Sequence, residues 1–191
     1  YEKQVVSDVI LTIDNAPINT TIGNLEANWS TEKDQASNTE LNLTTWYVND
    51  TSVPELTNYT FISFENTTKN EIWKFGITVF DGYGWSDEIN SSSMRIENTI
   101  PNITFTDLNA TTLAFNVDDN LTCYFTIHDD DVENLTVKYT WYKNRYGDFE
   151  INETGEIAVQ NDEQTRIDLD FSKTLKDDWW ECQIQACDEE M

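Results

Sequence analysis

Apolar residues occupy every second position in many short runs of the chain. Around Trp141 the run begins at Leu135 and continues through Val137 and Tyr139, with threonine and lysine between them. This period of two is typical of a strand with one buried face, so Trp141 is expected on the inner face. Similar runs predict further strands at 9–13, 25–30, 73–79, 121–127, 167–171 and 180–186. The pattern predicts an all-β fold.

The tripeptide Thr-Trp-Tyr occurs twice, at 45–47 and at 140–142, 95 positions apart. A repeat of that length predicts two units, each long enough to bury its own core. We expect the first unit at 9–98 and the second at 99–191, joined by a short linker. The boundary segment 98–101 ends in proline, which cannot donate to a strand ladder.

Two cysteines flank the second tryptophan. Cys123 precedes Trp141 by 18 residues and Cys182 follows it by 41, the framework of an immunoglobulin-like sandwich. When the two units are aligned, Ala27 and Phe75 stand at the cysteine positions. A small and a large residue there replace two medium ones, as a facing buried pair requires. We predict a Cys123–Cys182 disulfide; the alternative is two buried free thiols.

Two stretches are less regular than the rest. Leu43 is out of phase with Trp46, which predicts a bulge or a late strand start near Thr44. Glycines at 147 and 155 predict a loop-rich stretch after the second tryptophan.

Charge excludes several classes of partner. The formal net charge is −25 and the 11 basic residues are scattered singly. Such a surface repels phosphate backbones and anionic lipid, so no nucleic acid partner is expected. No apolar run approaches the length of a membrane helix, so no membrane insertion is expected in this segment. With a single histidine, His128, and no catalytic motif, we expect no enzyme.

Asparagine followed by any residue except proline and then serine or threonine is the acceptor for N-glycosylation. Well over half of the asparagines begin such a triplet, against about a fifth expected by accident. We predict dense N-linked glycans and an extracellular, cell-surface location; the alternative is a Thr/Asn-rich β surface. The acceptors are Asn19, Asn28, Asn42, Asn49, Asn58, Asn66, Asn90, Asn102, Asn109, Asn120, Asn134 and Asn152.

Four segments of the second unit carry a resemblance to a known family. They are Asp-Asn-Leu-Thr-Cys at 119–123, three aspartates at 129–131, Tyr-Thr-Trp-Tyr-Lys-Asn at 139–144 and Lys-Asp-Asp-Trp-Trp-Glu-Cys at 176–182. Together they resemble the tandem immunoglobulin-like or PKD-like repeats of archaeal cell-surface proteins. The resemblance implies two β-sandwiches in an S-layer-like or filamentous glycoprotein. The chain lacks the family's glycine after Asp130 and its Asp-Gly after the last strand.

The acidic loop after the strand that carries Cys123 is a candidate calcium site. Carboxylates of Asp129, Asp130, Asp131 and Glu133 are hard oxygen ligands of the kind that Ca²⁺ takes. The alternative is a plain solvated loop. No other cofactor is expected.

The ends of the chain suggest how units join. The first unit closes with a strand near 94–97, whereas the second has no equivalent after Cys182. Residues 1–8 form an additional N-terminal strand, a candidate donor whose Val5 and Val6 contact the next subunit. The alternative is a window cut from a longer tandem array. Cys187, without an evident partner, is either a buried thiol or a bond to another chain.

Two functions follow from these features. The first is a structural subunit or repeat segment of an archaeal surface filament or S-layer-like assembly. Its partners are copies of itself, joined head to tail, or neighbouring repeats of a longer chain. The alternative is an adhesin or carbohydrate-binding surface module that uses exposed loop aromatics, for which Tyr83, Trp85 and Tyr146 are the candidates.

Overall fold

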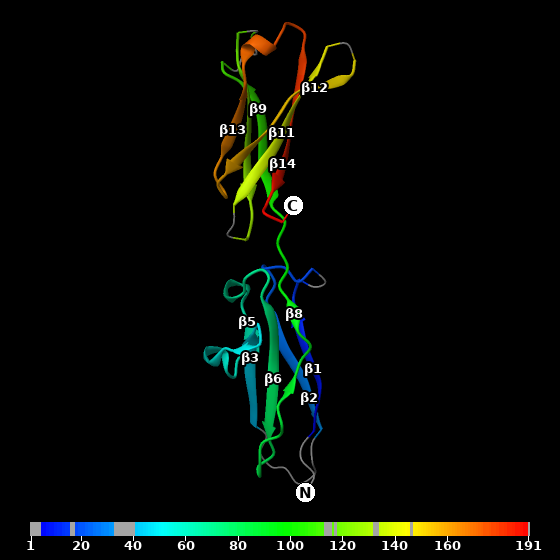
Figure 1. Ribbon diagram of the computed structural model, residues 1–191, viewed down its shortest axis with the longest axis vertical. Helices are drawn as coiled ribbons and strands as arrows, with labels where there is room; N and C mark the ends of the chain where they lie inside the picture. Colours follow the sequence, from blue (N-terminus) through cyan, green and yellow to red (C-terminus); the bar gives the residue numbers. More distant parts are fainter. Residues whose placement is uncertain are drawn as a thin grey trace. The chain divides into compact units, whose positions relative to one another are not determined.

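The computed structural model describes residues 5–15, 18–32, 41–112, 116, 118–131, 134–145 and 147–190 (Figure 1). Apart from three short 3₁₀ helices, their regular structure is strand. None of the described segments is a helix long and apolar enough to cross a membrane. The chain divides into two compact units, Tyr1–Thr99 (unit one) and Ile100–Met191 (unit two).

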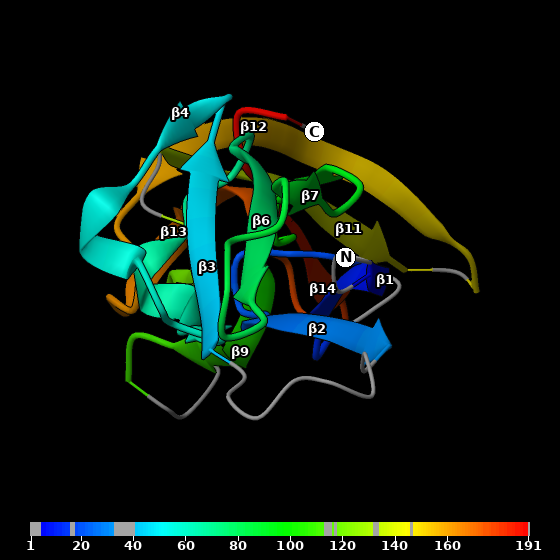
Figure 2. The same cartoon turned by 90° about the horizontal axis from the view of Figure 1, so that it is seen from below.

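Unit one contains two antiparallel sheets. One has the order β1-β2-β5 and the other β4-β3-β6-β7, with β8 also paired to β6. Figure 2 shows β3 and β6 side by side. The strands are β1 (Val5–Ile13), β2 (Leu25–Glu32), β3 (Leu41–Val48), β4 (Thr51–Ser52), β5 (Phe61–Ile62), β6 (Ile72–Phe80), β7 (Ile89–Asn90) and β8 (Met94–Arg95), and the 3₁₀ helices are η1 (Pro54–Leu56) and η2 (Phe64–Asn66).

Unit two repeats this plan, without counterparts of β7 and β8 among the described residues. Its sheets have the orders β13-β10-β9 and β12-β11-β14, again antiparallel. The elements are β9 (Asn102–Ala110), β10 (Leu121–His128), β11 (Leu135–Asn144), β12 (Phe149–Val159), β13 (Thr165–Leu169) and β14 (Trp179–Cys187), with the 3₁₀ helix η3 (Phe171–Lys173).

Both units have the same topology. In each, the first, second and fifth strands form one sheet, and the third, fourth and sixth form the other. This is the immunoglobulin-like sandwich, so the predicted fold class is confirmed. The alternating residues fill the interior: Trp46 and Trp141, at equivalent positions of β3 and β11, are both fully buried in their own cores.

The disulfide joins the two sheets of unit two. Cys123 on β10 and Cys182 on β14 are bonded, with their Cα atoms 6.3 Å apart. The counterparts in unit one, Ala27 and Phe75, both lie in the buried core of that unit. Cys187 is a free thiol, and it is buried.

The N-terminal strand differs from its prediction as a donor. Residues 5–8 are not a separate element, because they begin β1 and pair with the end of β2. Val6 is only 5% exposed and belongs to the core of unit one, while Val5 faces outward. The register shifts between Ser7 and Ile10, and Asp8 has a φ of 50°. This bulge reverses the facing of the strand, which simple alternation does not reveal. Residues 1–4 lie outside the described part.

The two irregular stretches also differ from their predictions. β3 pairs with β6 in unbroken register, so no bulge occurs near Thr44. Instead Thr44 itself faces inward, and its hydroxyl donates to the Tyr59 carbonyl at 2.8 Å. The predicted loop around Gly155 is the long strand β12, and a Cβ at this position would overlap the Tyr139 ring on β11. Glycine here allows close packing rather than a turn.

Candidate functional site

The outer side of β14 has no neighbouring strand among the described residues. β14 pairs with β11 alone and is the edge of its sheet. Its counterpart β6 pairs with β3 on one side and with β7 and β8 on the other. We call the outer side of β14, together with residues 177 and 178 before it, the open edge.

The segments that lead into β6 and β14 have the same local structure, so their residues compare at an offset of 107. The hydroxyl groups of Thr67 and Thr174 each donate to the carbonyl three residues earlier, at 2.9 Å. Asn70 and Asp177 both have a positive φ, of 71° and 70°. The approach to the sixth strand is therefore equivalent in the two units.

In unit one this edge is covered by β8 and the following Ile96, which we call the closing strand. The Asn70 N–H donates to the Ile96 carbonyl at 2.8 Å, and the Ile96 N–H donates to the Glu71 carbonyl at 2.9 Å. The Ile96 side chain is fully buried, and Met94 packs against the same core. The closing strand thus contributes backbone hydrogen bonds and apolar cover together.

In unit two the equivalent positions lack this cover. The backbone groups of Asp177 and Asp178 stand where Asn70 and Glu71 bond the closing strand, and the described residues offer them no strand. Trp180 and Ile184 are half-buried. Their counterparts Trp73 and Ile77 are 2% and 0% exposed. The inner face of β14 is therefore incompletely covered.

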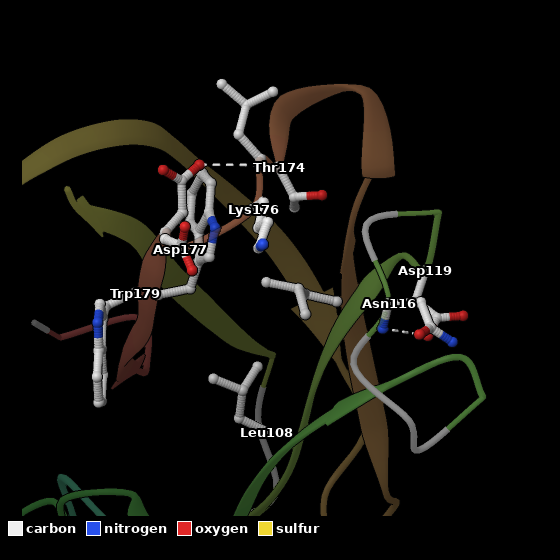
Figure 3. A pocket seen from close by; sticks show the side chains of 11 residues that line it. Leu108, Asn116, Asp119, Thr174, Lys176, Asp177 and Trp179 are labelled. Carbon is white, nitrogen blue, oxygen red and sulfur yellow. Dashed lines mark hydrogen bonds between the residues drawn. The ribbon is translucent and has the colours of Figure 1, made fainter.

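A pocket of about 580 Å³ lies beside the first residues of the open edge. Leu108 of β9 is part of its apolar lining, together with Leu121 and Trp180. Figure 3 shows Leu108, Asn116 and Asp119 approaching from one side and Thr174, Lys176 and Asp177 from the other. The pocket is a gap between the two sheets on the side where unit one has its closing strand.

The charges around the open edge are unevenly neutralised. The Asp178 side chain is fully buried, with its carboxylate 2.8 Å from Lys143 Nζ and 3.1 Å from Arg145 Nε. Lys143 also lies 5.1 Å from the centre of the Trp180 ring. Asp177 is exposed and has no basic partner among the described residues. The charge available at this edge is therefore negative.

Trp179 is the most exposed large apolar side chain of this region. It is 74% exposed, and Figure 3 shows its indole turned away from the pocket. Its counterpart in unit one is Ile72, which pairs directly with Arg95 of the closing strand. An indole at this position offers a flat face to whatever lies beside β14.

In the acidic loop that begins at Asp129, the described carboxylates mainly make hydrogen bonds and ion pairs within the loop and with its neighbours. Asp129 and Asp131 are buried, and Asp129 Oδ1 accepts the Asp131 N–H at 2.8 Å. Asp130 is exposed, with its carboxylate 3.4 Å from His128 Nε2. Glu133 lies outside the described residues. No three metal-binding side chains come together in the described part of the chain, and calcium stays a prediction.

His128 sits between carboxylates at the surface. Its Nδ1 lies 2.9 Å from Asp162 Oδ1, and this hydrogen bond, with the charges of Asp162 and Asp130, raises the pKa of the imidazole. The arrangement favours a protonated side chain that pairs with acids. It is the geometry of a surface ion-pair network, with no nucleophile hydrogen-bonded to the ring among the described residues.

Most predicted glycan acceptors lie on the surface. Nine of the twelve asparagines are exposed, and Asn19, Asn109 and Asn120 are half-buried. Asn28 is on the outward side of β2, as the alternation predicts. Asn120 has a structural role as well, because its Oδ1 accepts the Phe171 N–H at 2.9 Å.

The loop aromatics predicted for an adhesin are exposed in part. Tyr83 is 68% and Trp85 48% exposed, and the Trp85 ring lies 5.4 Å from that of Phe80. The turn that carries Tyr83 is held by Asp81, whose Oδ1 accepts the backbone N–H groups of Tyr83 and Gly84. Tyr146 lies outside the described residues.

Sequence reasoning missed Asp177, Trp179 and Leu108 as members of one site. A signal was present for the first two. Lys69-Asn70 and Lys176-Asp177 align at the offset of 107, and the residues that differ after the lysine are those that would meet a closing strand. No sequence pattern indicated Leu108, because its place in the pocket depends on which segments pack over it in three dimensions.

Comparisons with known proteins assign no family to the chain. No protein-family model matches the chain, and no curated protein matches it. Among solved structures, the chain is similar to the alpha chain of the chicken interferon gamma receptor, with a TM-score of 0.47 and 8% sequence identity. That alignment covers 96% of this chain and 89% of the receptor chain.

Proposed function

We propose that the chain is a structural module without catalytic activity, a subunit or repeat segment of an extracellular, N-glycosylated surface assembly. The observation that carries the proposal is the tandem repeat of one sandwich, with no strand paired to the outer side of β14 among the described residues. An unpaired strand edge is a template for pairing with another strand. A contact between this edge and a different surface of the next unit repeats head to tail.

The surface chemistry supports the same proposal. The acceptor asparagines are spread over both units and are mostly exposed. The net charge of −25 keeps the remaining surfaces apart. The resemblance of unit two to archaeal surface repeats favours a filament or S-layer-like layer as the assembly. In the single chain, residues 5–7 pair with β2 of their own unit, and the role of this segment as a donor strand stays a prediction.

The proposal is tested on protein isolated from its native source. Peptide mass spectrometry is expected to find glycans on the exposed asparagines, such as Asn28, Asn66 and Asn152. Electron microscopy of the same material is expected to find the chain in a repeating array. Native protein that is both unglycosylated and monomeric would contradict the proposal.

A carbohydrate-binding surface module is the second candidate. The exposed Tyr83 and Trp85, on a turn fixed by Asp81, are the observation that favours it. The double variant Tyr83→Ala, Trp85→Ala is expected to lose binding to a glycan array if this function holds. A matched pair of exposed aromatics in unit one, Tyr59→Ala and Phe61→Ala, serves as the control. Unchanged binding in the first variant removes this candidate.

A further inference from the structure

We infer that the N-glycan on Asn120 folds back onto the protein and lies in a groove on the outer face of the β13-β10-β9 sheet, where Tyr124 and Arg166 contact its first sugars. The inference rests on the proposed function, because its occupant is the glycan predicted for that asparagine. It deepens that function by naming a glycan that the protein surface holds and the side chains that hold it.

The groove lies over β10 and its two neighbouring strands and has a volume of about 370 Å³. The register of the sheet fixes its walls. Thr122 pairs with Asn109 of β9 and with Asp168 of β13, so these three residues form a row across the sheet. In the next row on the same face, Tyr124 pairs with Arg166. The groove is therefore built on strands rather than on loops.

Asn120 lines the same groove, two positions before Thr122. Its Oδ1 accepts the Phe171 N–H at 2.9 Å, and this bond fixes the amide group. N-glycosylation replaces one hydrogen of Nδ2 by a sugar and leaves Oδ1 as an acceptor. The modified side chain therefore keeps its bond to Phe171, and the first sugar begins at the groove.

The counterpart of Asn120 in unit one is Asn24, whose amide is engaged on both sides. Its Oδ1 accepts the Phe64 N–H at 2.9 Å, and its Nδ2 donates to Asp14 Oδ2 at 2.7 Å. In unit two Thr111 stands in the place of Asp14, since each donates its backbone N–H to the carbonyl of the asparagine. The Thr111 hydroxyl also donates to that carbonyl, and Asn120 Nδ2 has no partner among the described residues.

A second difference from unit one creates the acceptor triplet. Thr122 stands where unit one has Glu26, so Asn120 begins an acceptor triplet and Asn24 does not. Unit two therefore combines the acceptor sequence with an amide nitrogen that makes no hydrogen bond to the described part of the chain.

The side chains of the groove are of kinds that bind sugars. Tyr124 is half-buried, and no described residue bonds its hydroxyl, so a ring and a hydroxyl are both available. The Arg166 side chain is 62% exposed, and its Nε lies 3.5 Å from Asp168 Oδ2. The other guanidinium N–H groups can donate to sugar hydroxyls. An aromatic ring beside charged donors and acceptors matches a sugar, which has apolar C–H faces and polar edges.

The test uses the complete 191-residue chain, produced in a secretory host whose N-glycans begin with N-acetylglucosamine. An endoglycosidase that cuts inside the glycan is added to the folded protein, and peptide mass spectrometry follows trimming at each asparagine. We expect the Asn120 glycan to be trimmed about tenfold more slowly than the glycans on the exposed Asn66 and Asn152, because the docked sugars are withheld from the enzyme.

Two variants remove one wall of the groove each. Arg166→Ala and Tyr124→Ala are expected to bring trimming at Asn120 to within about twofold of the rate at the exposed asparagines. Arg166 is at the surface, so this variant keeps the fold if Tyr124→Ala does not. Lys138→Ala and Tyr142→Ala are the matched controls, because both residues lie on β11 in the other sheet, outside the groove. Both controls are expected to keep the slow trimming.

Three results would overturn the inference. They are equal trimming rates at Asn120, Asn66 and Asn152, slow trimming that persists in both groove variants, and Asn120 unmodified while other asparagines carry glycans. Slow trimming confined to concentrations at which the protein dimerises would equally overturn it, since a second copy then covers the groove. The host-produced glycoprotein decides the docking, whereas glycan mapping and imaging of native material decide the proposed function, so the two failures are distinguishable.

Discussion

Unit one and unit two are the same sandwich, and in the described residues they differ on the outer side of the sixth strand. β6 is a central strand and its inward residues are fully buried, whereas β14 is an edge strand among the described residues, and its inward Trp180, Cys182 and Ile184 are half-buried. Unit two has a disulfide that unit one lacks: the Cys123–Cys182 bond ties its two sheets together. The closing strand in one unit and the disulfide in the other are two ways to hold the sheets together.

The tryptophans show the same difference at atomic detail. In unit one the indole N–H groups of Trp46 and Trp73 have partners: Trp46 donates to the Tyr59 carbonyl and Trp73 to the Glu71 carboxylate, each at 2.9 Å. In unit two the buried N–H groups of Trp141 and Trp180 have no partner among the described residues. The counterpart of Glu71 is the shorter Asp178, which Lys143 holds. In the described residues, unit two therefore leaves more buried indole N–H groups without a hydrogen-bond partner, and its sixth strand is less buried than that of unit one.

Removal of the disulfide is expected to have the largest effect on stability, and to lower the unfolding free energy of unit two but not of unit one. The double variant Cys123→Ala, Cys182→Ala opens a loop of 59 residues in unit two. The expected loss is about 4 kcal/mol of the unfolding free energy of unit two. Unit one serves as the internal control. Denaturant titration followed by hydrogen-exchange mass spectrometry measures both units, and equal losses would contradict the expectation.

Ile77 of β6 and Ile184 of β14 occupy equivalent positions, so truncating each one compares how deeply the two strands are buried. Ile77→Ala removes a fully buried side chain and is expected to destabilise unit one by about 4 kcal/mol. Ile184→Ala removes a half-buried one and is expected to destabilise unit two by about 2 kcal/mol. The same titration measures both variants. A larger loss for Ile184→Ala would mean that β14 is covered in solution.

The indole pair gives a smaller difference. Trp73→Phe removes the hydrogen bond to Glu71, whereas Trp180→Phe removes an N–H that has no partner among the described residues. Beyond the loss of ring volume, which the two variants share, Trp73→Phe is expected to cost about 1 kcal/mol more. Thermal unfolding of each variant, compared with Trp46→Phe as a second hydrogen-bonded case, checks the difference.

The smallest effect concerns pH. The Asp162 carboxylate and its neighbour Asp130 raise the pKa of His128, so the protonated form is favoured in the folded state. This stabilisation is complete below the unfolded pKa of about 6.5 and is lost as the pH rises through the higher folded value. Because the side chain is well exposed, it amounts to less than about 1 kcal/mol. His128→Asn is expected to flatten the stability of unit two over that range; an unchanged slope would contradict this.

Alternation along the strands was sufficient to predict the sandwich. It predicted the inward faces around Trp141 and Phe125, because burial of one face imposes a period of two. Alignment of the repeat predicted the disulfide and the missing strand next to β14. These features follow from the local alternation of residues or from the internal repeat, and a single sequence contains both kinds of information.

Other features depend on contacts that no local pattern encodes. The bulge at Asp8 reverses the facing of Val6, and only the pairing with β2 reveals it. Gly155 reads as a turn, yet it makes room for the Tyr139 ring on the neighbouring strand. The pocket beside Leu108 arises from the absence of a neighbour. Each case is a tertiary contact that overrides a local preference.

Hydrogen exchange of the free 191-residue chain tests the central claim most directly. Backbone groups alternate in direction along a strand. In β6 both directions are bonded, since Phe75 and Val79 donate to Ser91 and Ser86 on the side away from β3. We predict slow exchange at consecutive amides of β6. In β14 we predict alternation, with slow exchange at Glu181 and Gln183 and fast exchange at Cys182 and Ile184. Uniform protection along β14 would contradict the open edge.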